Sequence, residues 1–129
     1  MSSVVGVVAA HGKLAAGLVS AVQAITGRGD ALASVSNEGL GPADVVATIA
    51  AALDKTGASV VFTDLPAGSC TLAARRLQKE RPNLTVVVGV NLPMLLEFVL
   101  REEHRGADIE FAVGRGREHV RIIPGTNVG

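Results

Sequence analysis

Residues 4–27 read VVGVVAAHGKLAAGLVSAVQAITG, an apolar run followed by a pattern of helical period. The run at 4–10 contains no alternating polar residues, which is typical of a strand buried on both faces of a sheet. Apolar residues then recur at helical spacing, at Leu14, Leu18, Val22 and Ile25. Gly27 follows, where a glycine often ends a helix. This stretch predicts a buried strand at 4–10 and a helix at 13–26.

Three more strand-then-helix units follow along the chain. Strands are expected at the segments 31–36, 59–64 and 84–90. Helices are expected at 42–56, 69–80 and 91–103. Four such units in succession imply a three-layer, doubly wound α/β fold, a mainly parallel sheet whose crossovers are right-handed. In the order 2-1-3-4, known from small proteins of this class, the first and third strands are neighbours.

The pattern weakens after Arg105. Short apolar segments, EFAV at 110–113 and HVRII at 119–123, flank the glycine-containing GRGRE and read as strands around a turn. HVRII is expected to add an edge strand. An unpaired sheet edge favours pairing with a second subunit, so we expect a homodimer. The residues 124–129 are expected to be a frayed tail.

Composition narrows the class of protein. A chain of 129 residues predicts a single domain at 1–129. Twelve basic residues balance twelve acidic ones, and Trp and Tyr are absent. This composition argues against nucleic-acid binding. A single cysteine excludes an internal disulfide and gives no metal-binding cluster, and no apolar run reaches the roughly 20 residues of a membrane span. We expect a cytoplasmic protein without metal or cofactor.

Polar residues follow three of the predicted strands directly. They are His11, Asp64 and Asn91. Ligands of open parallel sheets bind beyond the carboxyl ends of the strands, and the order 2-1-3-4 would bring His11 and Asp64 face to face. A carboxylate bonded to one imidazole nitrogen leaves the other nitrogen as a directed nucleophile. The pair therefore predicts a histidine that can attack phosphorus.

Two predicted helix starts flank that histidine. Gly12 and Lys13 open the first helix, and Gly68 and Ser69 open the third. Backbone N–H groups at helix starts bind anions. We therefore predict Gly12, Gly68 and Ser69 as phosphate-binding residues.

Other interpretations of these residues remain. A histidine after a buried strand is more often a turn residue, and Asp64 could form an Asx turn or a cap. Cys70 is either a small residue at a helix start or a reactive thiolate. His104 and His119 lack partners at ligand spacing and are predicted to be surface residues.

Three segments together resemble the enzyme IIA domain of the mannose-type sugar phosphotransferase system over nearly the whole chain. The segments are VVAAHGKLAAGLVSA, VVFTDLPAGSCTLAARRL and VVVGVNLPMLLE. The resemblance implies a parallel sheet of order 2-1-3-4 plus an antiparallel edge strand exchanged between two subunits. HVRII fits that last strand.

The resemblance also implies a function. His11 would accept phosphate from the phosphohistidine of the carrier protein HPr and pass it to an enzyme IIB, expected on a separate chain, during sugar uptake. Asp64 would orient His11, and Ser69 would help to hold the phosphoryl group. Contact with a membrane would be indirect, through a sugar permease.

One part of the family pattern differs here. The family usually has GGSP where this chain has Ala67, Gly68, Ser69 and Cys70. Two alternatives to transport are a regulatory domain, in which phosphorylated His11 controls a partner, and a phosphotransfer subunit of dihydroxyacetone kinase. The segment GVNLPMLLE argues against the second alternative.

Overall fold

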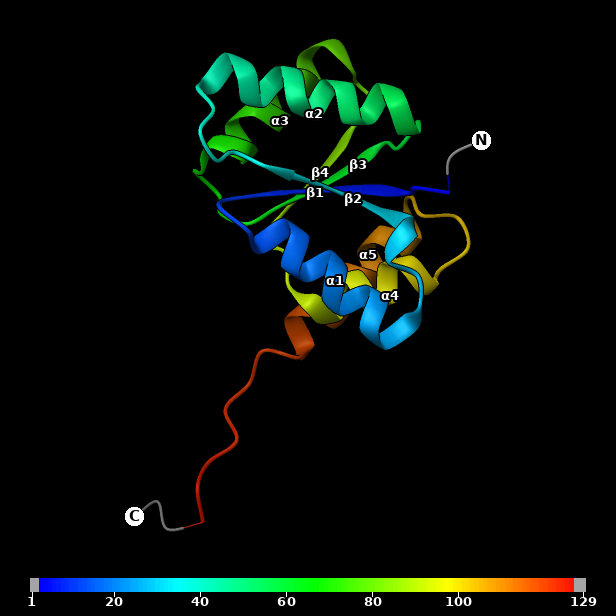
Figure 1. The fold of residues 1–129 in the computed structure, drawn as a ribbon. Helices are drawn as coiled ribbons and strands as arrows, with labels where there is room; N and C mark the ends of the chain where they lie inside the picture. Colours follow the sequence, from blue (N-terminus) through cyan, green and yellow to red (C-terminus); the bar gives the residue numbers. More distant parts are fainter. Residues whose placement is uncertain (1–2, 127–129) are drawn as a thin grey trace.

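A parallel sheet forms the middle layer of the computed structural model, which describes residues 3–126 (Figure 1). Its strands are β1 (Gly6–Ala10), β2 (Leu32–Ser36), β3 (Val60–Thr63) and β4 (Thr85–Val88). Their order is β2-β1-β3-β4, which confirms the predicted order 2-1-3-4. In the register, Ala10 lies beside Ser36 and Ala9 beside Thr63, so the residues that follow these strands emerge at one edge of the sheet.

Helices cover both faces of the sheet (Figure 1). They are α1 (Leu14–Thr26), α2 (Pro42–Thr56), α3 (Ser69–Glu80), α4 (Leu92–Leu100) and α5 (Ala107–Glu118), with a short 3-10 turn η1 (Gly29–Ala31) before β2. α2 and α3 cover one face, and α1, α4 and α5 cover the other. The predicted three-layer, doubly wound arrangement is therefore confirmed.

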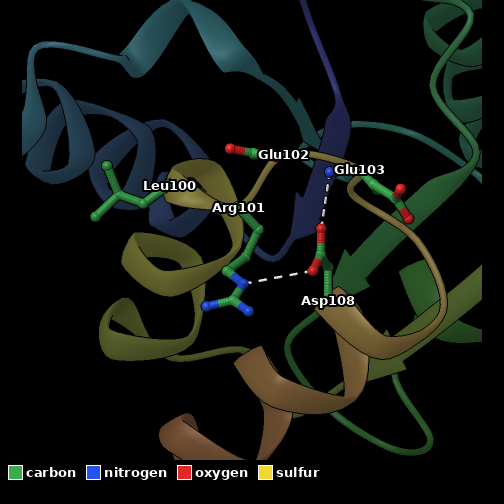
Figure 2. Close-up of a pocket in the computed structure, with 5 residues that line it drawn as sticks. All are labelled: Leu100, Arg101, Glu102, Glu103 and Asp108. Carbon is green, nitrogen blue, oxygen red and sulfur yellow. Dashed lines mark hydrogen bonds and ion pairs between the residues drawn. The ribbon is translucent and has the colours of Figure 1, made fainter.

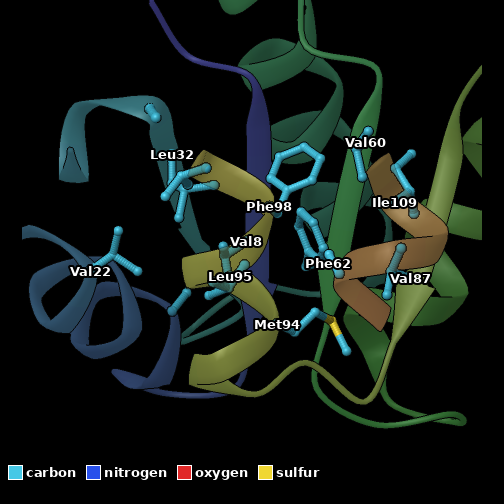
Figure 3. Close-up of a cluster of buried hydrophobic side chains, with 14 of the residues drawn as sticks. Val8, Val22, Leu32, Val60, Phe62, Val87, Met94, Leu95, Phe98 and Ile109 are labelled. Carbon is cyan, nitrogen blue, oxygen red and sulfur yellow. The ribbon is translucent and has the colours of Figure 1, made fainter. Parts of the chain in front are cut away.

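The two hydrophobic cores follow from the two faces of β1. Successive side chains of a strand point to opposite faces. Val8 belongs to the core beside α1, α4 and α5, which Figure 3 shows, and Val7 belongs to the core beside α2 and α3. Phe62 and Phe98 meet edge to face in the first core, with ring centroids 4.9 Å apart. Because both faces are buried, all five residues of β1 are buried, as its unbroken apolar sequence predicted.

The ends of the helices follow local sequence signals. Gly27 and Gly57 end α1 and α2 with φ angles of 71° and 77°, a left-handed conformation that favours glycine. α4 is shorter than predicted and ends at Leu100. The loop 101–106 follows. Asp108 stabilises this loop by accepting hydrogen bonds from the backbone N–H groups of Glu103 and His104.

The predicted strand at 110–113 and the turn at 114–118 are wrong, because both lie within α5. The helix buries Ile109, Ala112 and Gly116, which share one face. A Cβ at Gly116 would lie 2.9 Å from Cβ of Met94. This glycine therefore permits close packing of α5 on α4 instead of forming a turn.

Residues 119–126 leave the end of α5 and run away from the body of the molecule (Figure 1). The segment 119–123 forms no strand in the single chain. The exchange of an edge strand between two subunits stays a prediction. Val120, Ile122 and Ile123 are 76%, 90% and 87% exposed. The predicted tail is irregular through 126, and 127–129 lie outside the described residues.

Candidate functional site

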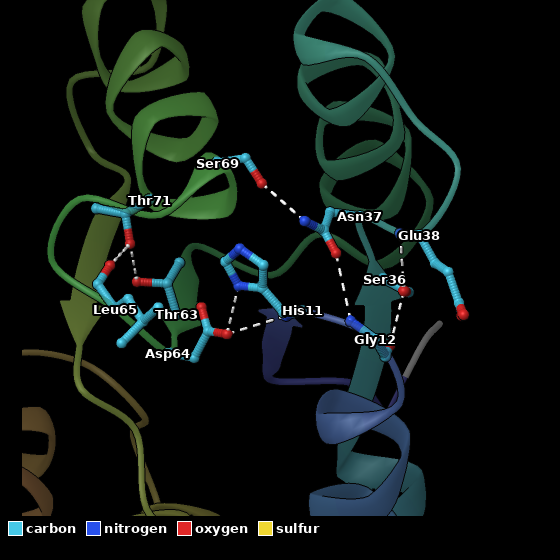
Figure 4. A network of polar contacts seen from close by, with 10 residues as sticks. All are labelled: His11, Gly12, Ser36, Asn37, Glu38, Thr63, Asp64, Leu65, Ser69 and Thr71. Atoms are coloured by element: carbon cyan, nitrogen blue, oxygen red, sulfur yellow. Dashed lines mark hydrogen bonds and ion pairs between the residues drawn. The ribbon is translucent and has the colours of Figure 1, made fainter.

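His11 and Asp64 meet at the carboxyl edge of the sheet, directly after β1 and β3 (Figure 4). The imidazole Nδ1 of His11 lies 2.7 Å from Oδ2 of Asp64. The backbone N–H of His11 donates to the same oxygen at 2.9 Å. The structure thus brings together the two residues that sequence reasoning paired.

The hydrogen bonds of Asp64 set its charge and the orientation of the imidazole. Its side chain is only 9% exposed, and burial raises the pKa of its carboxyl. The hydrogen bonds from the backbone and imidazole of His11 outweigh burial and hold this pKa below its usual value. The ionised carboxylate accepts the proton on Nδ1, which leaves the lone pair on Nε2. The side chain of His11 is 45% exposed, so the imidazole is accessible to a ligand.

The start of α3 lies against the imidazole. Gly68 is the N-cap residue, and no side chain caps the helix. The N–H groups of Ser69 and Cys70 therefore have no acceptor within the helix, and they carry the positive end of its dipole. By contrast, Gly12 donates its N–H to Asn37, and Gly68 makes a long bond to the carbonyl of Leu65. The amides that open α3 are therefore available to an anion.

Asn37 belongs to this cluster and was missed by the sequence analysis. It follows β2 directly, and its amide contacts both Gly12 and Ser69. The missed signal was its position, because β2 pairs with β1 and ends at the same edge of the sheet.

Other candidate residues lie elsewhere or are inert. Asn91 caps α4 through the N–H of Met94 and donates to the carbonyl of Gly116, so it joins helices and not the His11 cluster. Cys70 is fully buried, and burial, together with the charge of Asp64, raises the pKa of its thiol. The thiol therefore stays protonated, which disfavours the reactive-thiolate interpretation.

The two remaining histidines differ from each other. His104 is half-buried and packs edge-on against Phe98, with ring centroids 5.2 Å apart, so its prediction as a surface residue is wrong. His119 is exposed as predicted, and its Nδ1 lies 2.6 Å from the carbonyl oxygen of Arg115.

A pocket of about 410 Å³ lies near the end of α4 and the start of α5 (Figure 2). Two of its charged groups, Arg101 and Asp108, are paired with each other. Arg101 is 3.4 Å from Asp108 and lies over the ring of Phe111 at 4.2 Å. Asp108 also accepts the N–H groups of Glu103 and His104. These contacts fix the loop. Among the described residues, no group of His, Cys, Asp and Glu could hold a metal ion.

Gly68→Ala is expected to displace the imidazole of His11 and so to slow any phosphoryl transfer that uses it roughly 10- to 100-fold. A Cβ at position 68 would lie 2.9 Å from Cε1 of His11. The matched control is Gly41→Ala, because Gly41 caps α2 with a similar backbone conformation and a Cβ there meets nothing within 4 Å. Transfer rates and thermal unfolding of both variants check the prediction. Equal transfer rates in the two variants would contradict it.

Similarities to known proteins agree with this fold. The family model described as "PTS system fructose IIA component" matches residues 6–113, and no curated protein sequence matches the chain. The chain is similar to the phosphotransferase system component EIIA from Streptococcus agalactiae, with 23% identity and a TM-score of 0.81, over 92% of this chain and 96% of that one. The mannose/sorbose specific IIA subunit from Enterococcus faecalis is also similar, with 23% identity and a TM-score of 0.80, over 98% of each chain.

A sigma-54 interaction domain protein from Enterococcus faecalis shares the fold at 15% identity, with a TM-score of 0.70, over 89% of this chain and 90% of that one. At these identities, the structural similarities establish the fold alone. The family model covers most of the chain, including the ends of all four strands. The chain therefore belongs to the family of phosphotransferase system (PTS) fructose IIA components.

Proposed function

We propose that this chain is a single-domain phosphoryl carrier, which accepts phosphate from phospho-HPr on Nε2 of His11 and passes it to an enzyme IIB on a separate chain. The observation that carries the proposal is the 2.7 Å contact between Nδ1 of His11 and Oδ2 of Asp64, in a histidine whose side chain is 45% exposed. When Nδ1 of the neutral imidazole donates to Asp64, the lone pair is on Nε2. Membership of the PTS IIA family supports it. As the site of this exchange we propose the cytoplasm; no helix in the described part of the chain is long and apolar enough to span a membrane.

The transfer step uses groups that the site already presents. The lone pair on Nε2 of His11 attacks the phosphorus of phospho-HPr, and the bond between phosphorus and the donor nitrogen breaks, with its electrons returning to the donor imidazole. The proton on Nδ1 stays beside Asp64, whose negative charge stabilises the positive charge that develops on the ring. The N–H groups that open α3 and the hydroxyl of Ser69 bind the phosphoryl oxygens. Transfer to enzyme IIB reverses these roles.

Two incubations test the proposal. Labelled phospho-HPr is first mixed with the purified chain, and the label is expected to appear on the chain. Candidate enzyme IIB proteins are then added, and the label is expected to leave the chain for one of them. A chain that takes no label from phospho-HPr would contradict the carrier function.

A regulatory function is the second candidate. The observation that supports it is the fold that this chain shares with the sigma-54 interaction domain protein. In this case His11 accepts phosphate by the same chemistry, but the phosphorylated chain binds a partner and passes no phosphate on. Labelled chain that transfers to no enzyme IIB, yet binds a partner only in one phosphorylation state, would identify this function.

A homodimer forms a further part of the proposal. β4 is at one edge of the sheet, and the exposed apolar segment 119–126 has no partner strand in its own chain. Pairing of this segment with the sheet edge of a second copy would cover both.

A chain that ends at Glu118 is therefore expected to be monomeric at micromolar concentration, whereas the full chain is dimeric. Removal of 119–129 leaves α5 intact, so the monomer should remain folded. Sedimentation velocity of the two chains measures the difference. A full chain that sediments as a stable monomer would refute the homodimer.

A further inference from the structure

Asn37 connects the two helix starts beside His11 (Figure 4). Its side-chain Oδ1 accepts the N–H of Gly12 at 3.3 Å, and its Nδ2 lies 2.9 Å from Oγ of Ser69. Its backbone N–H donates to the carbonyl of Ala10, which extends the pairing of β1 and β2 by one residue. The position of the amide is therefore set by the sheet.

The contact with Gly12 decides which way the Asn37 amide points. A backbone N–H can only donate, so the side-chain atom that faces Gly12 must be the oxygen. The nitrogen consequently faces Ser69, and an amide nitrogen donates but does not accept. The hydroxyl oxygen of Ser69 must accept this hydrogen bond, and its own hydrogen must point elsewhere.

The hydroxyl of Ser69 lies close to where a phosphoryl group would be bound. Figure 4 shows Asn37 and Ser69 on one side of the imidazole and Asp64 on the opposite side. The second ring nitrogen points toward the side of Asn37 and Ser69. The adjacent Gly68 lies against the imidazole. A hydroxyl in this place, whose hydrogen is not used toward Asn37, can donate to a phosphoryl oxygen on Nε2 of His11.

We propose that Asn37 is a positioning residue that holds the hydroxyl of Ser69 as a hydrogen-bond donor to the phosphoryl group on His11. This inference rests on the proposed carrier function. Asn37 acts through Ser69, and it also holds the peptide group that follows His11.

The neighbouring turn allows Asn37 to be replaced without loss of the fold. Ser36 donates its hydroxyl to the carbonyl of Gly12 at 2.7 Å, and the N–H of Glu38 donates to Ser36. Gly12, with a φ angle of 56°, is thus held from a second side. Unfolding of an Asn37 variant is not expected.

The first test is a double-mutant cycle on transfer from phospho-HPr. Asn37→Ala and Ser69→Ala are each expected to slow transfer roughly tenfold, the effect of one lost hydrogen bond. If Asn37 acts through Ser69, the double variant is expected to be about as slow as Ser69→Ala alone. A double variant slowed by the product of both single effects would overturn the proposal.

The second test uses pH. In Asn37→Asp, an ionised carboxylate accepts from both Gly12 and the hydroxyl of Ser69, so it turns the hydroxyl hydrogen away from the phosphoryl group and adds a repelling charge. Transfer relative to the unmodified chain is expected to fall roughly 100-fold near neutral pH, since a charged group is misplaced at the site. Only toward about pH 4, the ordinary pKa of an aspartic acid, should the ratio begin to recover, because a protonated carboxyl can donate to Ser69 again.

Asn37→Ala provides the comparison, because its rate relative to the unmodified chain should not change over the same pH range. Glu38→Gln is the matched control on the same turn; it keeps the backbone bond to Ser36 and should transfer at the unmodified rate. A flat pH ratio for Asn37→Asp, or an unchanged rate for Asn37→Ala, would overturn the role of Asn37. Both outcomes can be measured only if the unmodified chain takes label from phospho-HPr. If the carrier function itself is wrong, the unmodified chain takes no label, so the two failures are distinguishable.

Discussion

His11→Gln is expected to accept no phosphoryl group from phospho-HPr. Glutamine keeps polarity and approximate length at position 11, but its amide nitrogen has no basic lone pair with which to attack phosphorus. The unmodified chain should carry a phosphoryl group that is labile in acid and stable in base. Intact-mass measurement and fragmentation of the two chains after exposure to phospho-HPr will show whether His11 is the acceptor.

The other two histidines provide the controls for this experiment. The ring atom Nε2 of His104 is buried, so a donor protein cannot reach it. His119 is exposed, but it lies beyond α5 and has no carboxylate against its ring. His119→Gln should therefore take label as the unmodified chain does. Label retained by His11→Gln would place the acceptor elsewhere.

The success of the fold prediction depended on burial. β1 is covered on both faces, so its sequence is uniformly apolar, and Gly27 marks the end of the next helix. These signals are local, and they were sufficient to predict the strand-then-helix units. The strand order came from small proteins of this class and from the family resemblance. α5 was missed because its glycines resemble a turn. Position 116 requires glycine because α5 lies in close contact with α4 there. This requirement arises only when the two helices pack together, so the sequence alone does not reveal it.

The same distinction applies to the candidate site. His11 and Asp64 stand out because each is the first polar residue after a buried strand. Asn37 does not stand out, because β2 already contains the polar residues Ser34 and Ser36 and its end is hard to see in the sequence. The requirement for glycine at position 68 depends on the distance to the imidazole, which no sequence pattern encodes.

Substitutions of Asp64 should separate two effects of its carboxylate, charge and orientation. In Asp64→Asn, the backbone N–H of His11 requires an oxygen at the position of Oδ2, so the amide oxygen should remain there and continue to accept from Nδ1. The imidazole keeps its tautomer but loses the negative charge. We expect transfer to slow about 10²-fold, near the lower end of the range for lost acid-base groups.

Asp64→Ala removes both the charge and the acceptor. The imidazole can then rotate and carry its proton on Nε2, which removes the nucleophilic lone pair from part of the population. Transfer should therefore slow about 10³- to 10⁴-fold, the effect seen when a catalytic histidine takes the wrong tautomer. Transfer rates from phospho-HPr, together with ¹⁵N NMR of the His11 ring, measure both effects: the spectrum of Asp64→Asn should keep the proton on Nδ1, and that of Asp64→Ala should show a mixture. Equal rates for the two variants would mean that orientation contributes nothing, and an unchanged rate in a folded Asp64→Asn chain would remove the charge of Asp64 from the mechanism. A slower rate in Asp64→Ala than in Asp64→Asn, with the matching change of tautomer, would assign the difference to the hydrogen bond that joins β3 to the histidine after β1.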